Sequence, residues 1–119
     1  MNPNETAPSR LVVLWTNGDK DVAEKMALLY TLNSKLRGWW PEVTLIVWGP
    51  STKLLSESKD LQAYLAKIIE AGVNVEACKV CTDMYGISAQ LEALGVDVRL
   101  MGQPLTEYLK DGNCRVITV

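Results

Sequence analysis

Histidine is absent from the 119 residues of this chain, and its absence removes several classes of chemistry at once. Ser-His-Asp and Cys-His catalysis, histidine general bases and histidine metal ligands all need an imidazole that a single chain does not contain. The three cysteines are one short of a four-cysteine zinc site, and their odd number fits a disulfide framework poorly. We therefore expect no metal site, no cofactor, and free thiols in the reducing cytoplasm.

The chain also lacks a long hydrophobic segment and a large excess of charge. The longest apolar run, Leu11–Trp15, is far shorter than the ~20 residues that span a bilayer. The first ten residues, MNPNETAPSR, contain no apolar segment of a signal peptide. With 12 basic and 14 acidic residues, the formal charge of −2 argues against binding nucleic acid through bulk charge. We expect a protein that binds neither membranes nor nucleic acid.

The length and the pattern of the chain indicate one α/β domain. At 119 residues the chain is long enough for one domain with a real core. Residues 1–10 are polar and are predicted to be a flexible lead-in, and residues 11–119 form the domain. Apolar strand-like segments alternate in that domain with four segments of helical spacing, and each of these helices is followed by a glycine. The predicted strands are Leu11–Trp15, Val43–Trp48, Val73–Ala77, Val96–Met101 and Cys114–Val119.

Strands that alternate with helices predict a parallel sheet with right-handed crossovers. Five strands and four helices fit the flavodoxin-like three-layer α/β/α fold with strand order 2-1-3-4-5. In that order the first helix lies alone on one face of the sheet. The thinly covered face is then predicted to carry four polar side chains and to make a subunit contact; these are Asn74, Glu76, Asp97 and Arg99.

Ligands of open parallel sheets collect at the carboxyl ends of the strands, near the point where the strand order reverses. The predicted order places that point between strands 1 and 3. The segments expected to meet there are Thr16–Asp19 and Cys78–Gly86, with Gly49–Ser51 and Met101–Gln103 further away.

The strongest local signal is the pair of cysteines in Cys78-Lys79-Val80-Cys81. A thiol directly after the third strand can receive backbone N–H groups and the positive end of a helix dipole, which lower its pKa and favour the nucleophilic thiolate. Lys79 adds a cation nearby. Two other interpretations stay open, since free cysteines often fill a core and a CxxC can be half of a metal site. Cys114 begins the last strand at the opposite edge, and we interpret it as structural.

The remaining candidate binding residues are polar or glycine positions near strand ends. Neither phosphate-binding glycine motif is present, and acidic residues at helix starts, such as Asp19 and Asp83, are usually caps. The Trp39-Trp40 pair could contact a partner or pack in the core. The binding candidates around the cysteines are Asn17, Gly18, Gly49, Lys79, Gly86 and Gly102.

The segment Glu76–Ile87, EACKVCTDMYGI, follows a strand, a long helix, a strand and a helix, and in this context it resembles the DsrE-like sulfur-relay proteins. The resemblance covers residues 11–119, and LVVLWTNGDKD, LRGWWPEVTLIVWG and RLMGQPLTEYLKDG look like a bacterial branch of that family. It implies a flavodoxin-like fold, assembly as a trimer or hexamer, and a cysteine after the third strand that carries sulfur as a persulfide. By position that role falls on Cys78.

Three functions therefore compete. The first is a sulfur carrier or sulfurtransferase, in which Cys78 takes sulfur from a donor and gives it to an acceptor, each a protein or a small thiol, and Cys81 is a possible resolving thiol. The second is a thiol-disulfide redox or sensing module that uses the same two cysteines. The third is a non-catalytic assembly subunit with structural cysteines.

Overall fold

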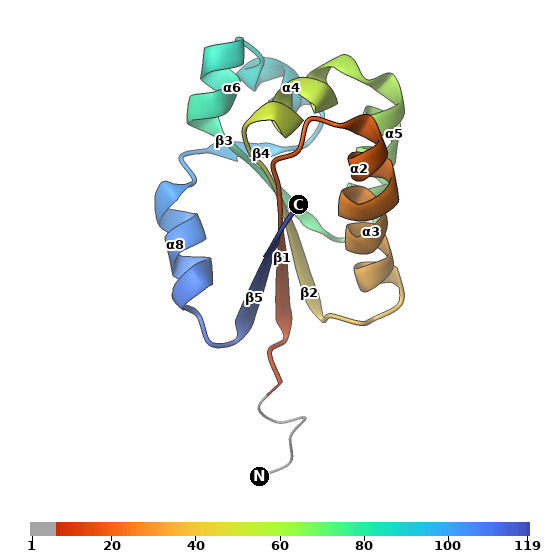
Figure 1. Cartoon of the computed structure of the whole chain (residues 1–119), viewed down its shortest axis with the longest axis vertical. Helices are drawn as coiled ribbons and strands as arrows, with labels where there is room; N and C mark the ends of the chain where they lie inside the picture. The colour runs from red at the N-terminus through yellow and green to blue at the C-terminus, as the bar shows by residue number, and fades with distance from the viewer. Residues whose placement is uncertain (1–6) are drawn as a thin grey trace.

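The computed structural model describes residues 7–119 and contains a five-stranded parallel sheet with helices on both faces (Figure 1). This confirms the predicted α/β fold. The strands are β1 (Arg10–Trp15), β2 (Glu42–Val47), β3 (Asn74–Cys78), β4 (Asp97–Arg99) and β5 (Cys114–Thr118). The helices are α2 (Lys20–Val22), the π-helix η1 (Ala23–Ala27), α3 (Leu28–Leu36), α4 (Pro50–Glu57), α5 (Lys59–Glu70), α6 (Lys79–Tyr85), α7 (Ser88–Ala93) and α8 (Gly102–Lys110).

The strand order is β4-β3-β2-β1-β5, which differs from the expected 2-1-3-4-5. β1 is an interior strand, as expected, but it pairs with β2 and β5 instead of β2 and β3. β2 pairs with β1 and β3, so it is interior as well. Its burial agrees with this place, because Val43–Val47 is buried throughout. An edge position, as the expected order required, would have left part of this apolar strand exposed.

The two faces of the sheet are covered unequally. The first three crossovers run in one direction, and right-handed connections therefore place their helices on one face, except that α6 lies beyond the carboxyl end of β3 (Figure 1). The last crossover returns past β1 and places α8 alone on the other face (Figure 1). The lone helix is thus the last one, where the expected order assigned this place to the first.

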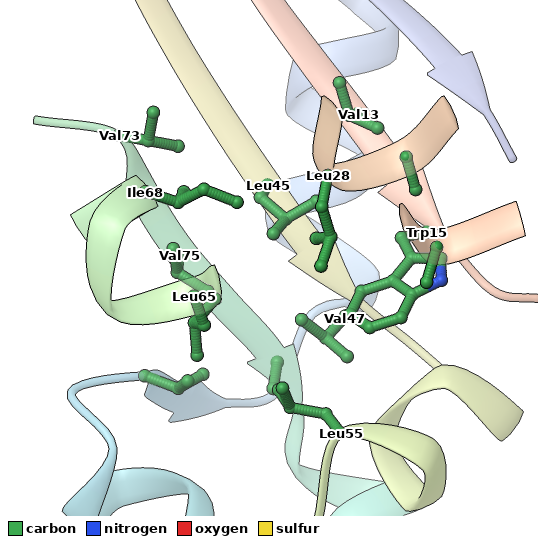
Figure 2. Close-up of a cluster of buried hydrophobic side chains, with 14 of the residues drawn as sticks. Val13, Trp15, Leu28, Leu45, Val47, Leu55, Leu65, Ile68, Val73 and Val75 are labelled. Carbon is green, nitrogen blue, oxygen red and sulfur yellow. The ribbon is translucent and has the colours of Figure 1, made fainter. Parts of the chain in front are cut away.

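The larger core lies between the sheet and the helices α3, α4 and α5 (Figure 2). Ser58 caps the start of α5 by accepting a hydrogen bond from the backbone N–H of Leu61. Helical spacing then directs Leu61, Leu65 and Ile68 toward the sheet, where all three are fully buried. The strands supply Val13, Trp15, Leu45, Val47 and Val75 to the same cluster.

A smaller core lies on the side of α8, and all three cysteines belong to it or pack against it. Its buried members are Val12, Ile46, Cys78, Met101 and Cys114, and Cys81 packs against them. Cys114 begins β5 opposite Arg10, at the amino end of the sheet, as predicted. Burial raises the pKa of the Cys114 thiol, which suits a residue of the core.

Glu76 is buried under α8 rather than exposed on an open face, which corrects the prediction. Glu76 is 5% exposed, and its carboxylate accepts a hydrogen bond from the Tyr108 hydroxyl at 2.6 Å, while Arg99 contacts its other oxygen. Burial and the bond to Glu76 together raise the pKa of Tyr108 to about 12. This contact fastens α8 to β3. Asn74, Asp97 and Arg99 remain exposed beside it, as expected.

The predicted lead-in lies largely outside the described residues. At its described end, the Ser9 backbone N–H donates to the Asn113 side chain at 2.9 Å, and Arg10 pairs with Glu42 at 2.9 Å. β1 therefore begins one residue before the predicted Leu11. Among residues 7–119, every helix is too short or too polar to cross a bilayer.

We expect Tyr108→Phe to destabilise the fold by about 1 kcal/mol near neutral pH, because a buried carboxylate loses one of its donors. The proton of Tyr108 is held more tightly in the folded chain, so its contribution is complete below pH 10, the ordinary pKa of tyrosine, and is lost as the pH rises toward about 12. Urea unfolding at a series of alkaline pH values should show a steeper fall for the wild type than for Tyr108→Phe. Tyr85→Phe, at the other end of the sheet, is the control and should follow the wild type.

Candidate functional site

Two thiols lie next to each other at the carboxyl end of β3. Cys78 is the last residue of the strand, and Cys81 lies in the first turn of α6, a helix where the sequence predicted a turn. Cys81 packs against the small core to which Cys78 belongs, and interaction with the Cys78 side chain raises the pKa of the Cys81 thiol. Cys78 is only 4% exposed, whereas Cys81 is partly exposed. The pair therefore has an inner and an outer thiol.

The outer thiol opens into a pocket of about 250 Å³ lined by Gly49, Cys81, Met84 and Tyr85. Cys81, Met84 and Tyr85 share one face of α6 because three or four residues separate them. Met84 is 82% exposed and forms part of the rim. Sequence reasoning missed Met84 and Tyr85, and helical spacing from Cys81 was the signal that could have found them.

Opposing influences act on the Cys81 thiol. Burial raises its pKa most, and interaction with the Cys78 side chain raises it further. The backbone N–H groups of Gly49 and of Cys81 itself act in the other direction, since hydrogen bonds from them to the sulfur lower the pKa. The net result is a pKa above the ordinary value, so the thiol is mostly protonated at neutral pH.

Lys79 does not serve the thiols as the sequence suggested. Its ammonium pairs with the Asp83 carboxylate at 2.7 Å along the surface of α6, and this hydrogen bond raises the pKa of Lys79. Asp83 also accepts from the Ser88 hydroxyl at 2.5 Å. Within the described chain, the Cys78 side chain makes no capping hydrogen bond to α6. The polar partner of the pair is the loop after β2.

The short loop of Trp48 and Gly49 connects β2 to α4 and brings Gly49 to Cys81 (α4 and α6 are neighbours in Figure 1). Ser51 and Thr52 follow it in the first turn of α4. The expected strand order placed this loop further away than Thr16–Asp19. In the observed order β2 lies between β1 and β3, so its loop is the neighbour of the cysteines. The buried Ser51 hydroxyl fixes the loop by donating to the Trp15 carbonyl at 2.5 Å and accepting from the Trp48 N–H at 3.1 Å.

The other candidates near β1 lie beside the thiol pocket and not in it. Gly18 packs against Pro50, and the two line a neighbouring hollow of about 400 Å³ that shares Tyr85 with the thiol pocket. Asn17 accepts a hydrogen bond from the Asp19 backbone N–H at 2.8 Å. Asp19 caps α2, as its sequence context suggested.

The last two glycine candidates have conformational roles. Gly86 ends α6 in the left-handed conformation, with φ 71°, which only glycine adopts readily. Gly102 begins α8 on the far side of β4. Of the six predicted binding residues, the structure brings Gly49 to the thiol pocket and Gly18 to the adjoining hollow. Groups of three or more side chains that could ligate a metal are absent from residues 7–119.

Comparisons with known proteins agree with this architecture. The chain is similar to BT1422, a conserved protein of unknown function from Bacteroides thetaiotaomicron, with 39% identity and a TM-score of 0.90 over 93% of this chain and 95% of that one. It also has the fold of the ychN protein from E. coli, with a TM-score of 0.69 and 18% identity over 94% of this chain and 99% of that one. No curated protein matches the chain.

The family comparison covers almost all of the described domain. The model of the DsrE/DsrF-like family matches residues 12–119, from β1 to the end of β5, and so includes both cysteines and the loop that contacts them. This chain belongs to the DsrE/DsrF-like family.

Proposed function

We propose that this protein carries sulfane sulfur as a persulfide on the Cys78–Cys81 pair and passes it to an acceptor thiol. Membership of the DsrE/DsrF-like family implies sulfur relay at the level of the family. The observation that carries the proposal is the contact between the two thiols, with the outer one in a pocket. Free thiols of this kind persist in a reducing cytoplasm, where we place the reaction.

The chemistry needs a thiolate and a suitable leaving thiol, and no histidine. A cysteine thiolate attacks the outer sulfur of a donor persulfide, R–S–SH. A bond forms between the cysteine and the sulfane sulfur, the S–S bond of the donor breaks, and R–S⁻ leaves. An acceptor thiolate then attacks the sulfane sulfur and releases the cysteine as a thiolate.

The exposure of the two thiols suggests a division of roles. The sequence assigned the sulfur to Cys78 and the resolving role to Cys81. Cys78 is buried, however, and Cys81 lines the pocket, so we propose that Cys81 meets the donor first. Cys78 can then take the sulfane sulfur from Cys81 through the thiol contact. If Cys78 attacks the inner sulfur instead, a Cys78–Cys81 disulfide forms and HS⁻ leaves.

The same contact favours a second function, a thiol-disulfide redox or sensing module. Two neighbouring thiols can reduce a disulfide of a partner protein, and the pair is oxidised to a Cys78–Cys81 disulfide while the partner gains two thiols. A third possibility, an assembly subunit with inert cysteines, predicts neither added sulfur nor a disulfide.

We expect Cys81→Ser to abolish persulfide loading from a small persulfide donor, because the donor then meets no accessible thiol. Cys78→Ser should still load at Cys81, and Cys114→Ser should behave as the wild type. Trypsin cleavage after Lys67, Lys79, Arg99, Lys110 and Arg115 places the three cysteines on three different peptides. Mass spectrometry of alkylated peptides can therefore locate each added sulfur atom.

The contrary outcomes separate the three functions. Loading at Cys78 in the Cys81→Ser protein would show that Cys78, the residue that the sequence favoured, accepts sulfur directly from the donor. Reversible linkage of the Cys78 and Cys81 peptides without any added sulfur would support the redox module. Equal loading of sulfur on the wild type and on a variant with both Cys78→Ser and Cys81→Ser would exclude the carrier function of this pair.

We also propose that the protein assembles as a homo-oligomer, as a trimer or hexamer. α8 leaves part of its face of the sheet open, and a hollow of about 410 Å³ lies there beside Asn74, Asp97 and Arg99. Trp39 is 56% exposed on another surface of the molecule, after α3. Exposed surface of this kind is typical of protein contacts.

Light scattering at tens of micromolar protein should give about three or six times the mass of the monomer, because the open sheet face would be covered by a second copy. A charge reversal at the rim of the hollow, Asp97→Lys, should lower that mass. Lys59→Glu, an exposed reversal on α5, is the control and should leave it unchanged. A monomeric mass for the wild type would contradict the proposal.

A further inference from the structure

The loop between β2 and α4 presents one backbone donor to the reactive sulfur. Gly49 and Cys81 line the same pocket, and the backbone N–H of Gly49 lowers the pKa of the Cys81 thiol. Gly49 is also the N-cap residue of α4, so its N–H lies outside the hydrogen bonds of that helix. We propose that the Gly49 N–H is a preorganised donor that stabilises negative charge on the sulfur of Cys81.

The conformation of Gly49 sets the direction of this donor. Its φ of 73° and ψ of −137° lie in a region that glycine occupies readily and other residues occupy under strain. A Cβ atom built on Gly49 would meet nothing within 4 Å. A substitution there therefore acts through the backbone angles, which turn the peptide plane, and not through a clash.

Two buried hydroxyls hold the loop in this conformation before any substrate arrives. Ser51 joins the loop to the end of β1 by its bonds to Trp15 and Trp48. Thr52 is also fully buried, and its hydroxyl donates to the Gly49 carbonyl at 2.6 Å. A donor that is already fixed costs no reorganisation when charge develops beside it.

The groups around Cys81 leave few other sources of stabilisation. Met84 and Tyr85 line the pocket with Gly49 and Cys81, and the ammonium of Lys79 is paired with Asp83. Lys53 and Glu57 of α4 line the adjoining hollow together and have opposite charges. The Gly49 N–H, together with the N–H of Cys81 itself, is therefore a polar group that acts on the sulfur against the effect of burial.

The consequence for sulfur transfer rests on the proposed function. When Cys81 attacks a donor, its sulfur starts as a thiolate. When an acceptor removes the sulfane sulfur, the same atom leaves as a thiolate. One donor at Cys81 would thus stabilise the anionic form in both the loading and the unloading step.

The test is the pH dependence of alkylation of Cys81 in the full-length chain, measured with iodoacetamide on its own tryptic peptide. We expect Gly49→Ala to move the midpoint of this profile to higher pH. At neutral pH the rate should fall about threefold, because about tenfold less thiolate is partly offset by its greater nucleophilicity. The peptide of Cys114 is the internal reference and should keep its profile.

Gly38→Ala is the matched control. Gly38 follows α3 with φ 66°, and a Cβ there would also meet nothing within 4 Å. Both variants place a Cβ on a residue of positive φ, so thermal unfolding should show a loss of stability for each, and only Gly49→Ala should shift the profile of Cys81. An unchanged profile in a folded Gly49→Ala protein would overturn the inference.

A second variant covers the case in which Gly49→Ala fails to fold. Thr52→Val keeps the shape of the side chain and removes its bond to the Gly49 carbonyl, so it should shift the profile in the same direction by a smaller amount. No shift with this variant would likewise count against the inference. The alkylation profile needs no sulfur donor, so a shift without persulfide loading in the wild type would refute the proposed function and leave this inference intact.

Discussion

The position of β2 between β1 and β3 is the constraint on which the site depends. It makes β2 a fully covered strand, with Val43–Val47 buried, and it places the loop after β2 directly beside the start of α6. Gly49 then meets Cys81, while Ser51 joins the same loop to the end of β1. Parallel strands deliver their following loops to one edge of a sheet, so this central strand determines which loops become neighbours.

The resulting site contains one buried thiol and one accessible thiol. Cys78 belongs to the small core under α8. Cys81 packs against this core and also lines a pocket on α6. Burial suppresses the thiolate of Cys81, and a fixed backbone dipole partly restores it. A thiol that is neither freely ionised nor inert suits the transfer of sulfur between partners, since exchange needs a thiolate that is also a competent leaving group.

The crossover from β4 to β5 runs in the opposite direction to the other three, and it determines how the second face of the sheet is covered. α8 alone covers that face of the sheet, and its Leu105 and Tyr108 pack against the small core there. The buried Glu76 carboxylate contributes a further contact, through Tyr108 of α8 and Arg99 of β4. Beside the contact of Glu76 with Tyr108 the sheet stays open. The buried Glu76 carboxylate therefore lies at the edge of an exposed hollow.

From the sequence alone, the α/β class, the parallel sheet and the two neighbouring cysteines at the end of the third strand could be predicted. These features depend on local spacing and on the apolar pattern of single segments. The strand order could not be predicted this way, and with it the burial of Glu76 and the meeting of Gly49 with Cys81 were missed. The sequence predicted a turn where the helix α6 lies, so it did not identify Met84 and Tyr85 as residues that line the pocket. Pairing between distant strands is decided by the packing of whole layers, because an apolar strand fits any interior place in a sheet and only the tertiary structure selects one.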